Sequence, residues 1–253
     1  MTTGQDSALA TPAPEPEPKP SPVQRIIGVL FSPDATMASI ARRPDWVLPL
    51  VLLLITSLAA GIIIAPRVDF SSATREAMEQ NKNIPQERID SAVKIATTMG
   101  KIFSYLAPVL SLIGLLVIAG VLLLAFRLFG GEGDFKQAFS VTCYASVPSI
   151  IKSVVTLIII LAKGSIIPAQ ELATLVRSNL GFLADMKTNP MAFALLSSFD
   201  IFSVWFLALM IIGFAYVSRL SKAKSAMIII SLWIVVLLLK LIGPAMQAMR
   251  ANK

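Results

Sequence analysis

The sequence contains no histidine, and it has a single cysteine, Cys143, among its 253 residues. Without histidine the chain cannot form a Ser-His-Asp triad, a Cys-His dyad or a zinc site of the Cys/His type. One thiol also excludes a disulfide within the chain, and we expect Cys143 to be a small apolar filler. Neither Gly-x-Ser-x-Gly nor a phosphate-binding loop ending in Gly-Lys-Ser/Thr occurs. The sequence therefore predicts a protein that is not an enzyme and binds no metal or cofactor.

Charge is scarce as well. Charged residues make up 15% of the chain, against roughly 25% in soluble domains. Apolar residues make up 55%, and the mean hydropathy is +0.75. One soluble core of this size cannot hide so much apolar surface, so the lipid bilayer is the predicted surrounding medium. The formal charge of +7 comes from scattered residues without a basic domain, which argues against a nucleic-acid partner.

The first 22 residues differ from the rest. From Pro12 to Pro22 every second residue is proline, a pattern that resists helix and sheet and favours extended polyproline II. Residues 1–22 are predicted to be a disordered, solvated, Pro-rich tail, with recognition as a PxxP ligand as the alternative. The segment lacks the basic start and apolar stretch of a secretory signal peptide.

Residues 23–45 predict two short amphipathic helices. In the first, apolar residues from Val23 to Phe31 recur at helical spacing, and Arg25 falls outside that set. Ser32-Pro33-Asp34 has the features of a second helix start, with a cap, a proline and an acid in the first turn. Amphipathic helices of this kind either lie on the lipid surface or pack against a bundle, and the sequence leaves both readings open.

Long apolar runs dominate the remainder and predict an all-α, polytopic membrane helix bundle. A run of about 20 residues makes a helix of about 30 Å, the thickness of the hydrocarbon core. The membrane domain is predicted over residues 46–244, followed by a C-terminal tail at 245–253. The five predicted transmembrane spans are 46–65, 102–126, 138–162, 191–217 and 225–242.

Basic residues near the span ends predict the orientation. They are denser in the two short loops, 127–137 and 218–224, than in the two long loops on the other side. Density in short loops is the better guide, because long loops translocate largely regardless of charge. We therefore expect a cytoplasmic N-terminus and, with five spans, a C-terminus outside. Binding of anionic headgroups is an alternative role for the basic residues of this face, which are Arg42, Arg43, Arg219, Lys222 and Lys224.

The two long loops on the other side also carry helical patterns. The second span continues a pattern that starts near Pro85, so its helix is expected to project beyond the membrane. In residues 163–190, leucines from Leu172 to Leu183 fall at helical spacing. That spacing predicts an amphipathic helix on the outer surface of the bundle.

Lys152 and Asp200 are the two charges deep inside predicted spans. Counted from the span ends, both lie about 14–15 Å inside, so antiparallel neighbours would bring them to one level. A charge at that depth is costly, and it normally faces a partner or a cavity. The pattern predicts an ion pair that fixes the packing of the third and fourth spans. The alternatives are a proton or ion pathway, or unpaired side chains that reach water or headgroups.

The segment between the second and third spans predicts a tight turn. Gly130, Gly131 and Gly133 permit positive backbone angles, and Asp134 followed by Gln137 is a capping box. A nucleotide-binding loop is excluded, because no strand precedes the glycines and no Lys-Ser/Thr follows them. Within the third span, Pro148 predicts a helix kink.

Four short segments resemble the Yip domain family. They are Leu30–Met37 (LFSPDATM), Ile40–Pro44 (IARRP), Leu128–Ser140 (LFGGEGDFKQAFS) and Tyr144–Pro148 (YASVP). The likeness covers roughly residues 26–240 and implies five spans with a cytoplasmic N-terminus. The long first outer loop is similar to that of bacterial members, which implies a bacterial cytoplasmic membrane.

The resemblance also bears on partners. Eukaryotic members are associated with Rab-type GTPases, so GTPase binding is implied by the resemblance alone. The Asp-Leu-Tyr-Gly-Pro stretch of those proteins does not precede the first span here. We expect a non-catalytic scaffold or organiser that acts through lipids, membrane-protein partners or a homo-oligomer. The alternative is a small transporter or channel component that uses Lys152 and Asp200.

Overall fold

The computed structural model describes residues 20–79, 84–186 and 188–251, and most of the predicted Pro-rich tail lies outside them. The described chain is an all-α helix bundle with two strands of two residues each. Five helices are long and apolar enough to cross a membrane, which confirms the predicted fold class. Their bounds are Val47–Arg67, Gln86–Leu128, Phe135–Lys163, Ile201–Ser218 and Lys222–Met246.

Two short helices precede the bundle. Helix α1 (Pro22–Phe31) starts with a capping box made by Ser21 and Gln24, and α2 (Pro33–Arg42) follows directly. Helix α2 packs against the bundle, because Met37 and Ile40 are fully buried. Helix α1 instead leaves an exposed apolar stripe, formed by Val23, Ile27 and Phe31. Packing on the bundle therefore holds for α2, whereas α1 keeps an apolar surface that suits a membrane interface.

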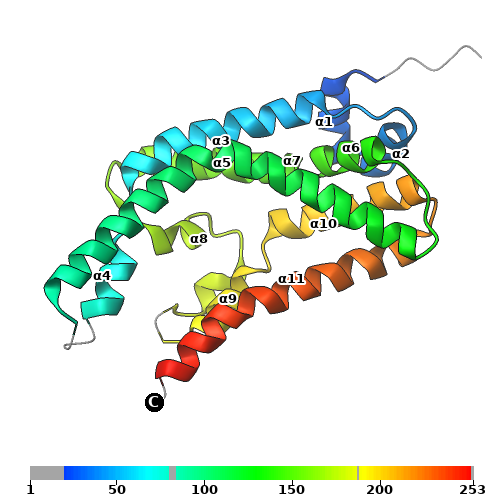
Figure 1. The fold of residues 1–253 in the computed structure, drawn as a ribbon. Coiled ribbons are helices and arrows are strands. Elements are labelled where there is room, and N and C mark those ends of the chain that lie inside the picture. The colour runs from blue at the N-terminus through cyan, green and yellow to red at the C-terminus, as the bar shows by residue number, and fades with distance from the viewer. Residues whose placement is uncertain (1–19, 80–83, 187, 252–253) are drawn as a thin grey trace, which may run out of the picture.

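Helices α3 (Val47–Arg67) and α5 (Gln86–Leu128) lie side by side (Figure 1). A Cβ at Gly61 would lie 2.3 Å from the Ser104 carbonyl oxygen, so glycine permits this close approach. The hydroxyls of Ser57 and Ser111 also meet at 3.2 Å. Small residues bring membrane helices close enough for dispersion forces and hydrogen bonds to hold them. At 43 residues, α5 is far longer than a membrane needs, as the sequence predicted.

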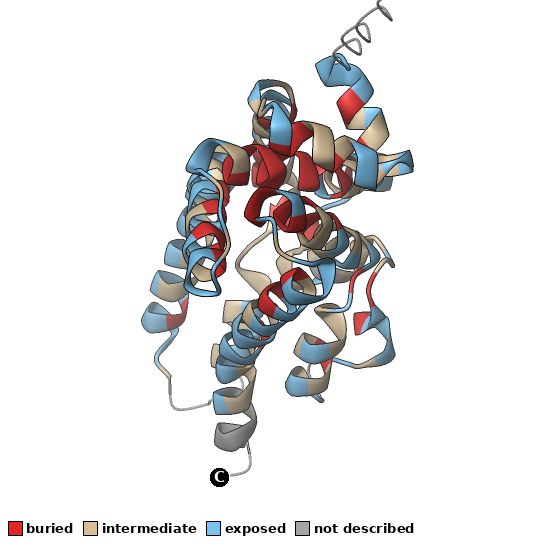
Figure 2. Cartoon of the chain, turned by 90° about the vertical axis from the view of Figure 1, so that its right-hand side faces the viewer, coloured by how far each residue is buried: buried red, intermediate tan, exposed pale blue. Residues whose placement is uncertain are grey.

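Helix α6 (Phe135–Ala145) lies at the centre of the core and continues, after a break, into α7 (Val147–Lys163). Every residue from Ala138 to Ala145 is buried. Helices α2, α3, α5 and α10 contact α6 on several sides. Figure 2 shows this buried centre and the more exposed helices around it.

The last apolar runs form α9 (Pro190–Ser197), α10 (Ile201–Ser218) and α11 (Lys222–Ala251). The predicted fourth span, 191–217, is therefore interrupted at residues 198–200. The cause is Asp200, whose carboxylate caps α10 by accepting from the amides of Phe202 and Ser203. Helix α11 continues to Ala251, so residues 245–251 belong to that helix and not to a separate tail.

Short elements cover the end of the bundle that lies away from α1 and α2. They include a parallel pair of β1 (Val68–Asp69) with β2 (Ile167–Pro168). The other members are α4 (Ser72–Glu79), the 3₁₀ turns η1 (Ala169–Glu171) and η2 (Leu180–Leu183), and α8 (Leu172–Leu175).

The predicted amphipathic helix over 172–183 is wrong. After Leu175 the backbone forms hydrogen bonds with the segment at the start of α10 and not within a helix. The Ile201 amide donates to the Ser178 carbonyl, and Asn179 forms an antiparallel β-bridge with Asp200. Those tertiary hydrogen bonds compete with the helix that the leucine spacing favours.

The two ends of the bundle differ in construction. We call the end formed by α1, α2, the turn at 129–134 and the turn at 219–221 the N-terminal face. The C-terminal end of α11 lies at the opposite, far end (Figure 1). Helix α10 runs from the far end towards the N-terminal face, and α11 runs from that face towards the far end, so residue spacing along each helix gives a distance from the N-terminal face along its axis.

Candidate functional site

The glycine turn connects α5 to α6 and contacts the end of α10. Gly130 and Gly133 have φ of 81° and 107°, angles that favour glycine. A Cβ at Gly131 would come within 2.9 Å of both the Phe126 carbonyl oxygen and the Ser218 Cβ. The Glu132 amide donates to the Ser218 carbonyl at 2.9 Å. The turn is thus shaped to contact α10 as well as to reverse the chain.

The capping box after the turn holds a second contact. Asp134 Oδ1 accepts from the Gln137 amide at 2.8 Å, and Gln137 Oε1 accepts from the Asp134 amide at 3.0 Å. Gln137 also donates through Nε2 to the Ala41 carbonyl near the end of α2, at 2.7 Å. One side chain therefore caps α6 and fastens α2 to it.

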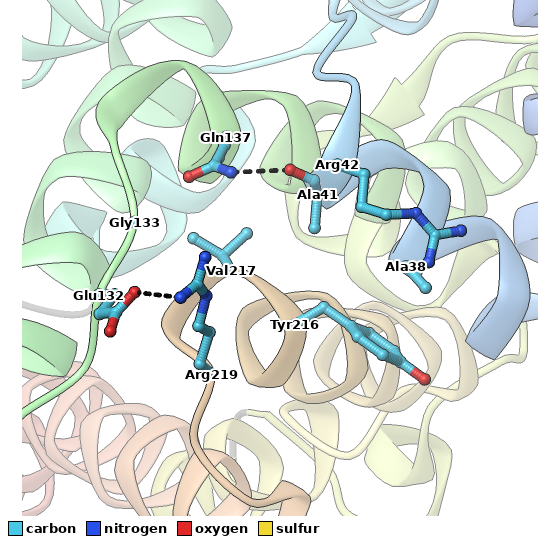
Figure 3. Close-up of a pocket in the computed structure, with 9 residues that line it drawn as sticks. All are labelled: Ala38, Ala41, Arg42, Glu132, Gly133, Gln137, Tyr216, Val217 and Arg219. Atoms are coloured by element: carbon cyan, nitrogen blue, oxygen red, sulfur yellow. Dashed lines mark hydrogen bonds and ion pairs between the residues drawn. The ribbon is translucent and has the colours of Figure 1, made fainter.

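A pocket of about 360 Å³ opens between these segments on the N-terminal face (Figure 3). Helix α2 contributes Arg42 at one side, and Arg219 follows α10 at the other. The Arg219 guanidinium lies 2.9 Å from the Glu132 carboxylate. For the Arg42 guanidinium, no hydrogen bond or ion pair is seen within the described residues. The remaining lining residues are Ala38, Ala41, Gly133, Gln137, Tyr216 and Val217.

A second charged contact lies beside this pocket. The Lys222 ammonium pairs with the Asp34 carboxylate, which also accepts from the Tyr216 hydroxyl at 2.8 Å. The hydrogen bond from Lys222, with that from Tyr216 second, holds the pKa of Asp34 below its usual range. Both side chains of the ion pair are more than half exposed, so the contact orients α2 more than it stabilises the fold.

Arg25 is a residue to which the sequence pattern assigned no contact. It was expected outside the apolar face of α1, yet it is only 5% exposed. Its guanidinium donates to the Arg43 carbonyl at 2.9 Å and to Ser39 Oγ at 3.3 Å. The carbonyl groups at the end of a helix need donors, and the positive charge suits the negative end of α2.

The five predicted basic residues all belong to the N-terminal face, but they do different things there. Arg42 lines the pocket, Arg219 pairs with Glu132, and Lys222 pairs with Asp34. Arg43 provides the backbone carbonyl that Arg25 binds. The remaining residue, Lys224, donates its backbone amide to Ser221 Oγ in the first turn of α11.

The third span is divided where the proline pattern placed a kink. Helix α6 ends at Ala145 and α7 begins at Val147, with Pro148 in its first turn. Proline has no amide hydrogen to donate. The Ser146 hydroxyl donates to the Thr142 carbonyl at 2.9 Å, which satisfies a carbonyl next to the break.

Lys152 and Asp200 are in direct contact, with Nζ and Oδ2 2.7 Å apart. The Asp200 side chain is 3% exposed and that of Lys152 is 34% exposed. The Ser178 hydroxyl also donates to Oδ2, and the amides of Phe202 and Ser203 donate to Oδ1. The carboxylate thus has four donors, which is close to its full capacity.

The position of Asp200 along its predicted span differs from the prediction. Asp200 is not inside a helix; it precedes α10, whose 18 residues run to the N-terminal face. Along α10, the pair therefore lies about 27 Å from the end of that helix at the N-terminal face. The prediction treated α9 and α10 as one span, because long apolar stretches lie on both sides of Asp200 in the sequence.

Ser178 is a contributor that sequence reasoning did not identify. It lies in the loop where a helix was predicted, and its carbonyl and hydroxyl both bind the Asp200 region. A lone serine in a polar loop carries no signal of such a role. Its contact appears only when the loop at 176–179 folds back against the start of α10.

Among the described residues, no three His, Cys, Asp or Glu side chains are grouped in a way that could hold a metal ion.

Comparison with known proteins shows which family the chain belongs to. Neither a curated protein nor a solved structure matches the chain. The model of the Yip1 domain matches residues 27–242, which include all five apolar helices apart from the last residues of α11. The chain is therefore a membrane protein that belongs to the Yip1 domain family.

Proposed function

We propose that the protein is a non-catalytic membrane scaffold whose N-terminal face binds an acidic segment of a partner protein. The pocket between α2 and the end of α10 carries this proposal. It has two guanidinium groups, from Arg42 and Arg219, and one carboxylate, from Glu132. The excess positive charge suits a carboxylate-bearing peptide, because arginine binds carboxylates through paired hydrogen bonds. Partner classes in keeping with the family resemblance are GTPases, other membrane proteins and further copies of this chain.

The proposal includes an orientation. We place the N-terminal face in the cytoplasm and the C-terminus outside, in the cytoplasmic membrane of a bacterium. Support comes from Arg219, Lys222 and Lys224 in the short connection 218–224 and from Arg42 and Arg43 just before the first span. Five spans put the two termini on opposite sides. Reporter fusions at both termini test the orientation, and a cytoplasmic C-terminus would overturn it.

The rigidity of the N-terminal face favours a scaffold. The turn, α2 and α10 are joined by hydrogen bonds from Gln137, Glu132 and Tyr216, so the pocket walls come from segments far apart in sequence. A preformed site binds at a lower cost in ordering than a flexible one does. The face can therefore present its two arginines without rearranging.

The test is capture of the partner from native membranes. A photo-crosslinking residue at Ala38, in the pocket lining, should yield a discrete adduct with the wild-type chain. Arg42→Gln with Arg219→Gln should abolish it, since both cationic groups are lost without adding repulsion. The matched control is Arg88→Gln with Lys94→Gln, two exposed residues of α5 away from the pocket. An adduct that survives the pocket variant, or disappears equally in the control, contradicts the proposal.

A second candidate function is transport. The observation in its favour is the interruption between α9 and α10, where Asp200 faces Lys152, since transporters use broken helices at their ion sites. Purified protein in proteoliposomes should then show proton- or substrate-dependent flux that Asp200→Asn abolishes. The four donors around the Asp200 carboxylate favour a structural role instead. Absence of flux in the wild-type protein would remove this candidate.

A further inference from the structure

An apolar groove of about 440 Å³ lies between α5, α10 and α11. It forms because α5 and α11 approach each other near the N-terminal face and diverge away from it (Figure 1), with α10 in contact with α11. Its polar lining residues are Ser203 and Lys240. The other lining residues are Val117, Ile118, Val121, Leu122, Phe206, Leu207, Met210, Ile229, Leu232, Trp233 and Val236.

The groove opens on the outer surface of the bundle. Val117, Val121 and Val236 are each about half exposed, at 56%, 48% and 49%. In a bilayer these side chains face lipid, so an acyl chain can enter sideways from the membrane. The groove walls are mostly apolar and offer it dispersion contacts.

Lys240 gives the groove its one charge. It is 18 residues after Lys222, the first residue of α11, so it lies about 27 Å from the N-terminal face. That distance is close to the thickness of the hydrocarbon core, about 30 Å, so the long Lys240 side chain can extend to the headgroups of the leaflet nearer the far end. The Lys240 ammonium has no hydrogen bond or ion pair within the described part of the chain, and the groove lining contains no acidic residue.

We propose that this groove binds one anionic phospholipid of the leaflet nearer the far end. An acyl chain fills the apolar groove, and the phosphate lies at Lys240. Charge complementarity selects this occupant: an unpartnered ammonium at headgroup level attracts an anion, and a lipid alone joins that anion to an apolar chain. A second copy of the protein fits less well, because a two-fold interface would bring two copies of Lys240 into one apolar contact. The inference is independent of the scaffold proposal, since the groove and the pocket share no residue.

Fluorescence of the groove tryptophan tests the proposal. In the full chain, Trp46→Phe and Trp205→Phe leave Trp233 as the single indole. The protein is reconstituted in phosphatidylcholine vesicles that contain either brominated phosphatidylglycerol or brominated phosphatidylcholine at equal mole fraction. One favourable charge contact at the membrane surface predicts a roughly five-fold preference of the site for phosphatidylglycerol in the quenching curves.

Variants assign the preference to Lys240. Lys240→Ala should remove it while quenching by brominated phosphatidylcholine stays unchanged, and Lys240→Arg should retain it. The control Lys163→Ala removes another exposed lysine, at the end of α7 and outside this groove, and should leave the preference intact. Equal quenching by the two lipids, or a preference that persists in Lys240→Ala, overturns the proposal. Protection of Trp233 from both lipids together with crosslinked dimers would assign the groove to a second copy and overturn it as well.

A second measurement avoids the tryptophan substitutions. Native mass spectrometry of the wild-type chain, purified in mild detergent with equimolar phosphatidylglycerol and phosphatidylcholine, should show retained phosphatidylglycerol. The Lys240→Ala variant should lose that adduct. An adduct of the same intensity in Lys240→Ala contradicts the proposal whatever the fluorescence shows.

Discussion

The contact between Lys152 and Asp200 allows a quantitative test of what holds α7 to α10. Asp200→Asn keeps a good helix cap, because asparagine caps as well as aspartate, so the variant removes mainly the charge. Loss of one partner from a buried ion pair costs about 3–5 kcal/mol. Since the Lys152 side chain is one-third exposed, its ammonium can reach polar surroundings, and we expect a loss of about 2 kcal/mol.

The double variant separates the pair from its surroundings. Lys152→Met alone should also cost about 2 kcal/mol, because the buried carboxylate then keeps only Ser178 and two backbone amides. Lys152→Met with Asp200→Asn should cost only about 1 kcal/mol, because no uncompensated charge remains. The expected coupling energy between the two positions is therefore about 3 kcal/mol.

Unfolding in mixed micelles, with rising SDS followed by tryptophan fluorescence and circular dichroism, measures these free energies. The matched control is the pair of Lys163 and Glu171, 3.4 Å apart with side chains 44% and 51% exposed. Its coupling energy should stay below about 0.5 kcal/mol. An Asp200→Asn variant as stable as the parent, or equal coupling in the two pairs, would refute the reasoning.

Three further predictions concern the N-terminal face. Gly133→Ala should destabilise the protein more than Gly130→Ala does. A Cβ at Gly133 would lie 2.5 Å from Val217, whereas a Cβ at Gly130 would meet open space. In the same unfolding assay, we expect the free energy of unfolding to fall by about 1 kcal/mol for Gly130→Ala and by more for Gly133→Ala. Asp134→Ala should cost about 1 kcal/mol through the lost cap, and hydrogen exchange should locate the loosening at the start of α6. The pKa of Asp34 is lowered in the fold, so its contribution is fully present above the unfolded value near 4 and is lost as pH falls through the lower folded value. Hydrogen-exchange protection of α2 should therefore drop below pH 4, and Asp34→Asn should remove that dependence.

The sequence was most informative where a pattern depends on local physics. Apolar runs longer than the hydrocarbon core can only be membrane spans, and glycine followed by a capping box can end one helix and start the next. The extension of the second span's helix back to Gln86 follows from apolar residues at helical spacing. In these elements, residues close in the sequence already provide hydrogen-bond partners for the backbone amides and carbonyls.

Where a residue's partner is distant in sequence, the local pattern misled. Apolar residues on both sides of Asp200 predicted one continuous span, yet the carboxylate caps a new helix and binds Lys152 and Ser178. Leucines at helical spacing predicted a helix over 172–183, yet hydrogen bonds to the start of α10 interrupt it. Arg25 was only placed outside the apolar set of α1, and its contact with the end of α2 was not predicted.

The absence of histidine, the scarcity of charge and the five apolar runs determined the class of protein by themselves, because the cost of exposing apolar surface to water does not depend on how the helices are arranged. The tertiary structure decided which charges meet, how deep they lie and where pockets open. Those properties depend on close approach between segments up to 188 residues apart, such as Asp34 and Lys222. An ion pair needs contact within about 4 Å, and only the packing of the helices brings such groups that close.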